Sequence, residues 1–422
     1  MPGTADPDLS ERLNRECRCV TLDPDALRAA LERESGDPDF FAAQLAAHPH
    51  LFSNAPVFLS QAHFAAMSRT VRAIESVARL SAYRETVLSR SPEIARPDFG
   101  PRGAFMGYDF HLAHEGPRLI EINTNAGGAF LNALLARAQH ACCAEMDAGL
   151  RRSEAYDFDA AMARMFEREW RLQRREGAPR LVAVVDDAPQ EQHFYPEFVL
   201  AQRALGRHGM ETLIADAREL RFEAGALSFE GRRIDLVYNR LVDFSLEAPE
   251  HAALRAAYLA GAAVLTPNPH VYALFADKRN LALLSDPALL RSFGVPEETV
   301  AALAGVPRTV PVMAANAEEL WRNRRKLFFK PAAGYGSKAV YRGDRMTHKV
   351  WDAIRRGDYV AQDYAAPSER VVEVDGAPAV RKTDVRLYVY DGETLLAAAR
   401  LYRGQATNFR APGSGFAPVF VV

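Results

Sequence analysis

The chain has 422 residues, of which 48% are hydrophobic and 25% are charged, so it can bury large cores and should divide into two or three domains. Its 52 Lys and Arg residues nearly balance its 54 Asp and Glu residues, which argues against a broad basic surface for nucleic acid or an anionic membrane. The sequence has neither a signal-peptide pattern at its start nor the ~18 consecutive apolar residues of a membrane span. We therefore expect a cytoplasmic protein with no nucleic-acid or membrane partner.

The first part of the chain is predicted to be helical and then to form a hairpin. Residues 1–59 carry scattered helical patterning and no candidate chemistry. Over 60–89, apolar side chains recur at three- and four-residue steps, which predicts one long amphipathic helix or two. The pattern then alternates over 106–122 around a turn, so we expect a β-hairpin that ends in a loop at Gly127 and Gly128.

Four cysteines fall in this first part of the chain, as two tight pairs: Cys17 with Cys19, and Cys142 with Cys143. They lack the repeated spacing of a disulfide framework. A four-thiolate zinc site is the alternative, but the wide separation of the pairs and the missing knuckle spacing match it poorly. We interpret them as buried or bystander thiols.

Strands and helices alternate in the middle of the chain. Short apolar strands are predicted near 181–186, 211–215 and 234–238, and a helix is predicted from 249 to 260. This alternation is typical of a small doubly wound α/β domain, which we place at 178–275.

The last part of the chain indicates an antiparallel sheet with few helices, hence an α+β domain. Two strands surround a glycine loop after Lys330, one helix is predicted in "THKVWDAIRR", and Asp391-Gly392 gives the strongest hairpin signal in the sequence. The predicted fold is thus α/β and α+β multidomain. Its predicted segments are 1–59, 60–177, 178–275 and 276–422.

The loop after Lys330 is the first candidate for chemistry. Gly334 and Gly336 let backbone N–H groups approach an anion closely, and Ser337 and Lys338 add side-chain donors. The expected ligand is a polyphosphate. The segment is not a Walker A phosphate-binding loop, because the lysine precedes the glycines. A plain hairpin loop with a surface lysine is the alternative, with equal weight on spacing alone.

The predicted hairpin carries a candidate metal site. Glu121 and Asn123 point to the same face of one strand, and the turn can bring Asp109 beside them. Carboxylate and amide oxygens of this kind suit Mg²⁺, which completes its coordination with phosphates and water. The alternative is a partly solvated strand end. Glu121 follows an apolar pair, so we expect a counter-charge near it.

A third group of candidates lies near the end of the chain. Asp384 and Arg386 share a strand face, and Arg400 lies on the partner strand across the hairpin. Arginines placed in this way can neutralise a phosphoryl group or bind a carboxylate, although surface ion pairing is the alternative. The loop that follows has a composition typical of binding loops. Its candidate residues are Asn408, Gly413 and Gly415.

Taken in order, these segments resemble the ATP-grasp superfamily. The matching motifs are "DK" at 277–278, "KPAAGYGSK" from 330, "YVAQDY" from 359 and "RLYRGQATNFRAPGSG" from 400. In the common arrangement the hairpin that ends in Glu-x-Asn comes last, whereas here it precedes Lys278 by about 150 residues. The chain therefore resembles the circularly permuted members, such as eukaryotic-type glutathione synthetase and glutathionylspermidine synthetase. This implies that 60–150 completes the nucleotide-binding domain begun near 276, and that 178–275 is the substrate-side domain that precedes it.

The resemblance implies ATP and one or two Mg²⁺ ions as cofactors. It assigns nucleotide contacts to Lys278, Lys330, Gly334, Gly336, Ser337, Lys338, Gln362, Asp363 and Tyr364, the last three through backbone groups at the adenine. It assigns the metal to Asp109, Glu121 and Asn123, catalysis to Lys330, Arg386 and Arg400, and the substrate to Arg240 and the loop that holds Asn408, Gly413 and Gly415.

One position departs from the family pattern. Many relatives have an arginine two residues before the first metal-ligating Asp, and this chain has Gly107 there. Another arginine must therefore stabilise the anion. The candidates are Arg102, Arg386 and Arg400.

The implied activity is that of an ATP-dependent carboxylate-amine ligase, which makes an amide through an acylphosphate and releases ADP and phosphate. Small-molecule acids and amines are its expected partners. The sequence leaves open whether the chain forms a homodimer. Two alternatives remain at this stage: a phosphotransferase on the same fold, and a nucleotide-binding regulatory protein without turnover.

Overall fold

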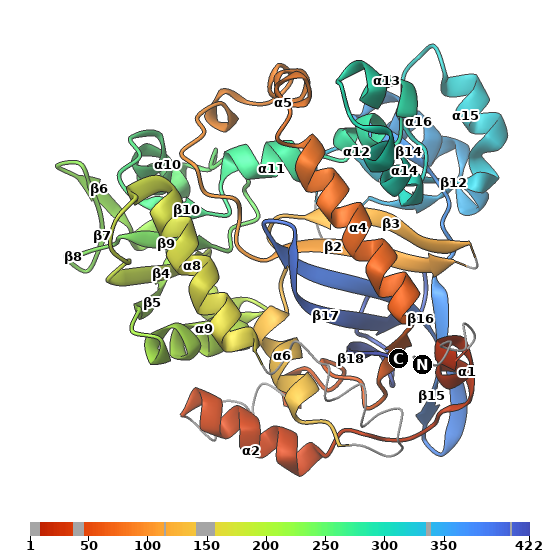
Figure 1. Cartoon of the computed structure of the whole chain (residues 1–422), viewed down its shortest axis with the longest axis horizontal. Helices are drawn as coiled ribbons and strands as arrows, with labels where there is room; N and C mark the ends of the chain where they lie inside the picture. Colours follow the sequence, from red (N-terminus) through yellow and green to blue (C-terminus); the bar gives the residue numbers. More distant parts are fainter. Residues whose placement is uncertain (1–8, 37–45, 114, 141–156, 335–338, 406) are drawn as a thin grey trace.

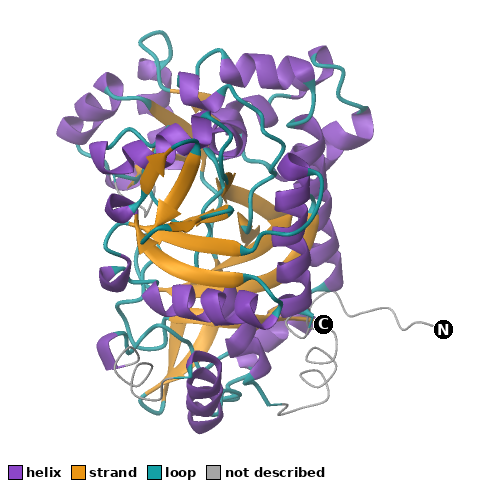
Figure 2. Cartoon of the chain, turned by 90° about the vertical axis from the view of Figure 1, so that its left-hand side faces the viewer, coloured by secondary structure: helices purple, strands orange, loops and turns teal. Residues whose placement is uncertain are grey.

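The computed structural model describes residues 9–36, 46–113, 115–140, 157–334, 339–405 and 407–422. A large sheet lies at the centre of the molecule, with a parallel sheet to one side and a small antiparallel sheet above it (Figure 1). Helices flank the strands on the outside (Figure 2). The predicted mixture of α/β and α+β structure is confirmed.

The central sheet has the strand order β1-β18-β17-β16-β2-β3, and β15 also pairs with β16. β1 and β18 are parallel, and the other pairings in this sheet are antiparallel. The strands are β1 (Val57–Leu59), β2 (Met106–Ala113), β3 (Gly116–Asn123), β15 (Ser368–Val374), β16 (Ala377–Tyr390), β17 (Glu393–Tyr402) and β18 (Gly415–Val421).

Two hairpins of this sheet match the sequence patterns. Asp391 and Gly392 both have positive φ, 50° and 84°, as the tight turn between β16 and β17 requires. The pairing of β2 with β16 sets Asp109 opposite Arg386 across 277 residues of chain. The early hairpin thus completes the sheet built by the end of the chain, as expected. The circular permutation relative to other proteins stays a prediction.

The periodic segment 60–89 forms two helices, α4 (Gln61–Val77) and α5 (Ser81–Leu88). α4 crosses one face of the central sheet (Figure 1). Its buried Met67, Val71 and Ile74 belong to the same core as the buried residues of β2. This apolar stripe, with a spacing of three to four residues, explains why the segment is helical and which side faces the sheet.

The parallel sheet has the order β10-β9-β4-β5, and all its pairings are parallel. Its strands are β4 (Leu181–Asp186), β5 (Glu211–Asp216), β9 (Leu236–Asn239) and β10 (Val264–Thr266). The helices around it are α8 (Phe158–Arg174), α9 (Tyr195–Arg207) and α10 (Ala252–Leu259). A small sheet of β6 (Arg221–Glu223), β7 (Ala226–Phe229) and β8 (Arg232–Arg233) adjoins it. This agrees with the α/β unit predicted for the middle of the chain.

The small antiparallel sheet has the order β11-β14-β12-β13. Its strands are β11 (Thr309–Pro311), β12 (Leu327–Pro331), β13 (Tyr341–Arg342) and β14 (Tyr359–Asp363). Phe329 of β12 packs against Trp351, with ring centroids 5.5 Å apart, in a separate core below the helices. Because this small sheet and its helices have a core of their own, they form a packing unit separate from the central sheet.

The expectation of few helices after residue 276 is wrong. This part contains α12 (Arg279–Leu284), α13 (Pro287–Ser292), α14 (Glu297–Ala302), α15 (Ala317–Asn323) and α16 (His348–Arg356). The missed helices have six or seven residues, fewer than two turns, and so they are too short to display a helical period.

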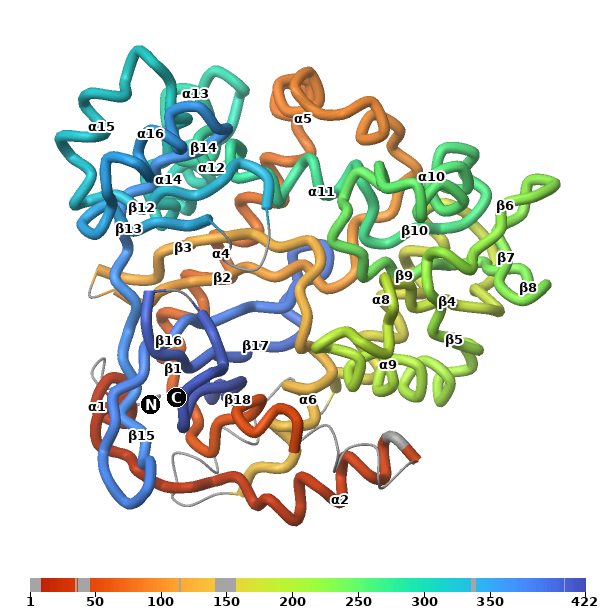
Figure 3. The backbone as a smooth tube through the Cα atoms, turned by 180° about the vertical axis from the view of Figure 1, so that it is seen from behind, coloured from red at the N-terminus to blue at the C-terminus, as the bar shows by residue number. Residues whose placement is uncertain are grey.

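The remaining helices are α1 (Leu9–Glu16), α2 (Pro24–Ser35), α6 (Ala129–Arg137) and α11 (Pro269–Phe275). Fully buried Arg370 of β15 ties the N-terminal segment to the central sheet, because its guanidinium donates to the carbonyls of Pro56 and Cys17 at 2.7 Å each. Figure 3 shows α1 beside β15. Cys17 and Cys19 are free thiols, and the other cysteine pair lies outside the described residues.

No helix within the described ranges combines the length and apolarity that a bilayer crossing requires. The four predicted domain boundaries stay predictions.

Candidate active site

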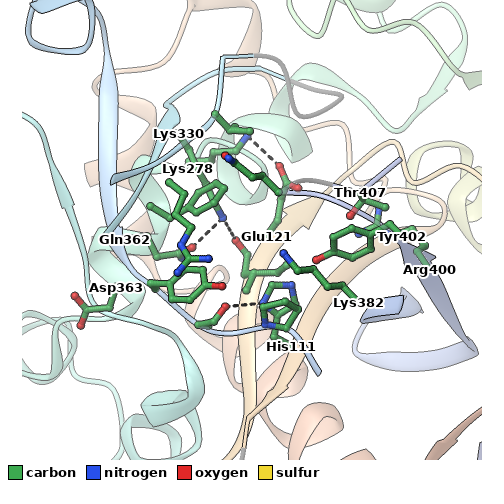
Figure 4. Close-up of a pocket in the computed structure, with 18 of the residues that line it drawn as sticks. His111, Glu121, Lys278, Lys330, Gln362, Asp363, Lys382, Arg400, Tyr402 and Thr407 are labelled. Atoms are coloured by element: carbon green, nitrogen blue, oxygen red, sulfur yellow. Dashed lines mark hydrogen bonds and ion pairs between the residues drawn. The ribbon is translucent and has the colours of Figure 1, made fainter. Parts of the chain in front are cut away.

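A cavity of about 970 Å³, counting its open mouth, lies between the central sheet and the small antiparallel sheet (Figure 4). Strands β3, β12, β14, β16 and β17 all contribute to its wall. The lining residues that carry the chemistry are Glu121, Lys278, Lys330, Gln362, Lys382 and Arg400. The site is therefore assembled from segments that are remote in the sequence.

Two lysines line this cavity, Lys330 near the end of β12 and Lys278 at the start of α12. Lys330, 8% exposed, donates from Nζ to the Ile120 carbonyl at 2.6 Å and to Gln362 Oε1 at 2.8 Å. Burial lowers the pKa of Lys330 to about 8, although nearby Glu121 acts to raise it. Lys278 donates to the Gly334 carbonyl at 3.0 Å. The partners of the two ammonium groups are backbone carbonyls, the Gln362 amide and the single carboxylate of Glu121. One positive charge therefore remains for an anion.

Glu121 supplies the counter-charge to these lysines, as expected from its apolar neighbours. Its Oε1 lies 3.2 Å from Lys278 Nζ. Burial acts to raise the pKa of Glu121, but the ammonium groups of Lys278 and Lys330 outweigh it, and the pKa is lowered. The carboxylate is thus ionised and remains 30% exposed toward the cavity, so it is available to a cation.

Asp109 is the centre of a second, deeper cluster. It is 0% exposed, and it accepts from Arg386 Nε at 2.6 Å, Arg386 Nη2 at 2.8 Å and Arg400 Nη2 at 2.7 Å. Arg400 also donates from Nε to Asp384 at 2.6 Å. Burial acts to raise the pKa of Asp109, but the two guanidinium groups lower it to about 2.

The predicted catalytic arginines are therefore brought together. Burial opposes the charge of Arg386 and of Arg400, yet the carboxylate of Asp109 raises the pKa of both. Fixed in this way, both cations keep their charge and geometry without a ligand, which is the preorganisation that stabilises developing negative charge.

The position of Arg386 explains Gly107. The two residues are neighbours across β2 and β16, and a Cβ on Gly107 would lie 3.2 Å from Arg386 Nε and 2.6 Å from Ala126 Cβ. A side chain at 107 therefore competes with Arg386 for the same space. Arg102, the third candidate, is exposed and does not line the cavity. Arg386 thus occupies the space in front of position 107.

The predicted metal ligands lie together at the end of the hairpin, and their chemistry fits a hard divalent cation. Asn123 donates from Nδ2 to Asp109 at 3.1 Å, which leaves its amide oxygen for another partner. Glu121 adds an ionised carboxylate. The arginines take up most of the acceptor capacity of Asp109. Glu121 and the amide oxygen of Asn123 therefore suit Mg²⁺, with further ligands from phosphate and water, and Asp109 orients Asn123.

No cluster of three or more His, Cys, Asp and Glu side chains that could hold a metal was found in the described ranges. The candidate set at the hairpin includes an amide, so it is of a different kind.

Residues 362–365, called the hinge below, hold the positions expected to contact adenine and lie beside the cavity. Two of their backbone N–H groups already have partners. The N–H of Asp363 donates to the Arg308 carbonyl at 2.8 Å, and that of Tyr364 donates to the Lys326 carbonyl at 2.8 Å. Gln362 holds Lys330 with its side chain. A base contact at these residues would therefore use carbonyl oxygens or side chains.

Arg240 lies behind the loop at Gly127 and Gly128 and does not line the main cavity. It is 6% exposed, its Nη1 donates to the Tyr238 hydroxyl at 3.2 Å, and its Nε has no partner in the described part of the chain. Burial opposes its charge, but Tyr238, Glu197 and Asp186 raise its pKa. It lies between β9 of the parallel sheet and the loop that follows β3.

The predicted substrate loop is only partly placed at the cavity. Asn408 donates to the Arg403 carbonyl at 2.9 Å. Gly413 has φ of 71° and packs against Val374, and a Cβ on Gly415 would lie 2.7 Å from the His50 carbonyl oxygen. Positive φ and close packing thus explain both glycines, against side chains at Gly413 and against backbone at Gly415. Gly336, Ser337 and Lys338 lie outside the described residues.

Several cavity residues were missed as candidates, although Tyr402 and Thr407 lie within the motif from 400. Thr407 donates to Asp384 at 2.8 Å and so supports Arg400 from behind. His111, Lys382 and Tyr402 also line the cavity. For His111 the strand alternation offered a signal, because it shares a face with Asp109 two residues away.

A smaller cavity of about 390 Å³ adjoins the main one and shares Lys278 and Gly334 with it. Its wall includes Asn123 and the loop that follows β9. It also includes the stacked rings of Phe244 and Tyr272, whose centroids lie 4.0 Å apart. The space next to the lysines is therefore bounded by both amide and aromatic groups.

No protein-family profile matches the chain, and no curated protein matches it. Among solved structures, it is similar to a glutathione synthetase-like effector from Globodera pallida, with 13% identity, a TM-score of 0.59, and coverage of 96% of this chain and 98% of that chain. A putative gamma-glutamylcysteine synthetase from Methylobacillus flagellatus is also similar, at 12% identity over 87% and 89% of the two chains, but its TM-score of 0.47 is too low to support an argument. The first likeness confirms the predicted glutathione synthetase-like fold.

Proposed function

We propose that this chain is an ATP-dependent ligase that joins a carboxylate to an amine through an acylphosphate and releases ADP and phosphate. One observation carries the proposal. Lys278, Lys330 and Arg400 line a single cavity together with Glu121, and Arg386 lies behind Arg400, where both arginines bind Asp109. On this fold, such a surplus of fixed cations beside oxygen ligands suits a triphosphate and its metal ion.

The residues divide the work by position. Lys278 and Lys330 would bind phosphate oxygens, and Glu121 with Asn123 would hold Mg²⁺, with Asp109 orienting Asn123 and both arginines. When bound, Mg²⁺ supplies neutralisation of phosphate charge. Arg400, with Arg386 behind it, would stabilise the negative charge that develops on the transferring group.

The chemistry accounts for this set of residues. A carboxylate is a poor electrophile, so its oxygen attacks the terminal phosphorus of ATP, the bond from that phosphorus to ADP breaks, and an acylphosphate results. An amine then attacks the acyl carbon, phosphate leaves, and the amine loses a proton. The smaller cavity beside Lys278 is the natural place for these substrates. Its aromatic wall would also help to exclude water from the intermediate.

The test is ADP release from Mg-ATP with a panel of acids and amines, added singly and in pairs. We expect release only when an acid and an amine are both present. Glu121→Gln should lower turnover by at least about 100-fold, by analogy with the loss of a group that stabilises a developing charge. Glu115→Gln, at the exposed tip of the same hairpin, is the matched control and should retain turnover.

The outcomes separate the alternatives. ADP release that requires an acceptor hydroxyl and no amine would replace the ligase by a phosphotransferase. ATP binding without turnover on any pair would favour a regulatory nucleotide binder. A chain that binds no ATP would overturn the assignment.

A further inference from the structure

His111 is a buried, titratable cavity residue that the proposed chemistry does not use. It lies on β2, two residues beyond Asp109 on the same strand face, and it is 9% exposed. Figure 4 shows its ring at the edge of the cavity, with a hydrogen bond to the neighbouring hinge. A charged or polar side chain in such a place needs a partner or a task.

The bond to the hinge fixes which ring nitrogen carries the proton. His111 Nδ1 lies 2.8 Å from the Ala365 carbonyl oxygen. A carbonyl oxygen can only accept, so Nδ1 donates. An ordinary imidazole is neutral at pH 8. In the neutral ring, Nε2 is then an acceptor with its lone pair in the plane of the ring.

The surroundings favour a flat, apolar ligand with a polar edge at this end of the cavity. Ile120 and Phe328 supply apolar walls, and Tyr364 and Ala365 supply the hinge. The lysines and Glu121 mark the opposite, phosphate end. A nucleotide whose phosphates meet the lysines therefore places its base beside the hinge and His111.

The donors of the hinge add to the argument. Since the N–H groups of Asp363 and Tyr364 are bound to Arg308 and Lys326, and the Ala365 carbonyl is bound to His111, the hinge has given up part of its capacity to recognise a base. Recognition of the base edge then falls to side chains that line the cavity, and Nε2 of His111 offers an acceptor there.

We propose that His111 is a specificity-determining residue of the nucleotide site, whose Nε2 accepts a hydrogen bond from the exocyclic amine of a 6-aminopurine. This inference rests on the proposed nucleotide site. A 6-oxopurine would set its carbonyl oxygen against the Nε2 lone pair, two acceptors without a proton between them. Such a mismatch in a buried site lowers affinity by about tenfold or more.

Two variants separate this role from a purely structural one. His111→Asn can keep a donor near the position of Nδ1, toward Ala365, and loses the acceptor at Nε2. His111→Gln can reach the position of Nε2 with an amide oxygen and loses the short-range donor. The hinge contact and the base contact are therefore removed one at a time.

The experiment measures the binding of Mg-ATP and Mg-ITP at pH 8 by calorimetry. These nucleotides differ at position 6 of the base. We expect the parent to prefer ATP, His111→Asn to lose about tenfold of that preference, and His111→Gln to retain part of it. Lys330→Ala is the control, because it should weaken both nucleotides alike and preserve their ratio.

A ratio of ATP to ITP affinity that is unchanged in His111→Asn overturns the inference, and so does a parent that binds the two nucleotides equally. Either result leaves the proposed ligase intact. A parent that binds neither nucleotide overturns the proposed function and this inference together.

Discussion

Two clusters of buried charge in this molecule are built in opposite ways. In the parallel-sheet part, His251 is 2% exposed and both ring nitrogens bind carboxylates, Nδ1 to Asp243 at 2.7 Å and Nε2 to Asp187 at 2.9 Å. In the cavity, Asp109 is bound by Arg386 and Arg400, and the lysines stand nearby. In the first cluster both ring nitrogens have carboxylate partners, whereas Lys278, Lys330 and Arg400 of the second line a cavity.

The charge balance of the two clusters shows what they can do. In the cavity and directly behind it, ion pairs join Lys278, Arg386 and Arg400 to the carboxylates of Glu121, Asp109 and Asp384, and Lys330 adds a further cation. The histidine cluster has two carboxylates for one ring, and Asp187 is 46% exposed. A surplus of fixed positive charge around a cavity indicates a ligand, whereas a histidine bound on both sides by carboxylates, one of them exposed to solvent, indicates a structural link.

The largest expected effect is on stability when the centre of the cavity cluster is neutralised. Asp109→Asn leaves two buried guanidinium groups without their main counter-charge, and it should lower the free energy of unfolding by about 3–5 kcal/mol. Asp187→Asn should cost less than about 1 kcal/mol, because solvent screens that carboxylate. Urea unfolding followed by circular dichroism measures both, and equal costs would remove the contrast between the clusters.

A smaller effect is expected on nucleotide affinity. Lys330→Ala removes a buried cation from the phosphate end of the cavity, and it should weaken Mg-ATP by about 10- to 100-fold, as expected for a charge-assisted hydrogen bond. Lys349→Ala, on the exposed face of α16, should bind like the parent. Calorimetry decides, and equal affinities for the two variants would place the phosphates elsewhere.

The space in front of Gly107 gives a third prediction. Gly107→Ala forces a methyl group toward Ala126 and Arg386, and it should cost about 1–3 kcal/mol of stability. Gly206→Ala is the control in the other region, because it lies in α9 with open space around its Cβ position, and it should be stabilising by up to about 1 kcal/mol. Thermal unfolding compares the two. A neutral Gly107→Ala would show that position 107 does not restrict Arg386.

The smallest effect concerns pH. Burial acts to lower the pKa of His251, but Asp187 and Asp243 outweigh it, so the folded pKa lies above the ordinary 6.5. His251 therefore contributes its full stability below pH 6.5 and loses it as the pH rises through the folded value. The difference in unfolding free energy between the parent and His251→Gln should fall by under about 1 kcal/mol from pH 6 to pH 9. An increase over that range would contradict the assigned pairing.

Local pattern predicted the elements better than their meeting points. The alternation over 106–122 and the Asp391-Gly392 turn were enough for both hairpins, because register and turn geometry are local properties. The contact between Asp109 and Arg386 spans 277 residues, and no local pattern encodes it. Gly107 became intelligible only once Arg386 was placed beside it.

The candidate site was predicted unevenly for a related reason. An ionisable side chain that directly follows apolar residues is costly to bury, so it indicates a partner or a ligand. Lys330 and Glu121 were identified for this reason. Gly413 and Gly415 resembled a binding loop, but their positive φ and close contacts with neighbouring protein atoms explain them without a ligand. His111 has no motif, and its interest depends on Ala365, which is far away in the sequence.

The most direct test of the central claim follows the oxygen atoms. With the acid that the ADP-release panel identifies labelled with ¹⁸O in its carboxyl group, activation as an acylphosphate transfers one labelled oxygen to the phosphate that is released. We predict labelled phosphate in equal amount to the amide formed, by mass spectrometry. Unlabelled phosphate accompanying amide formation would contradict the account.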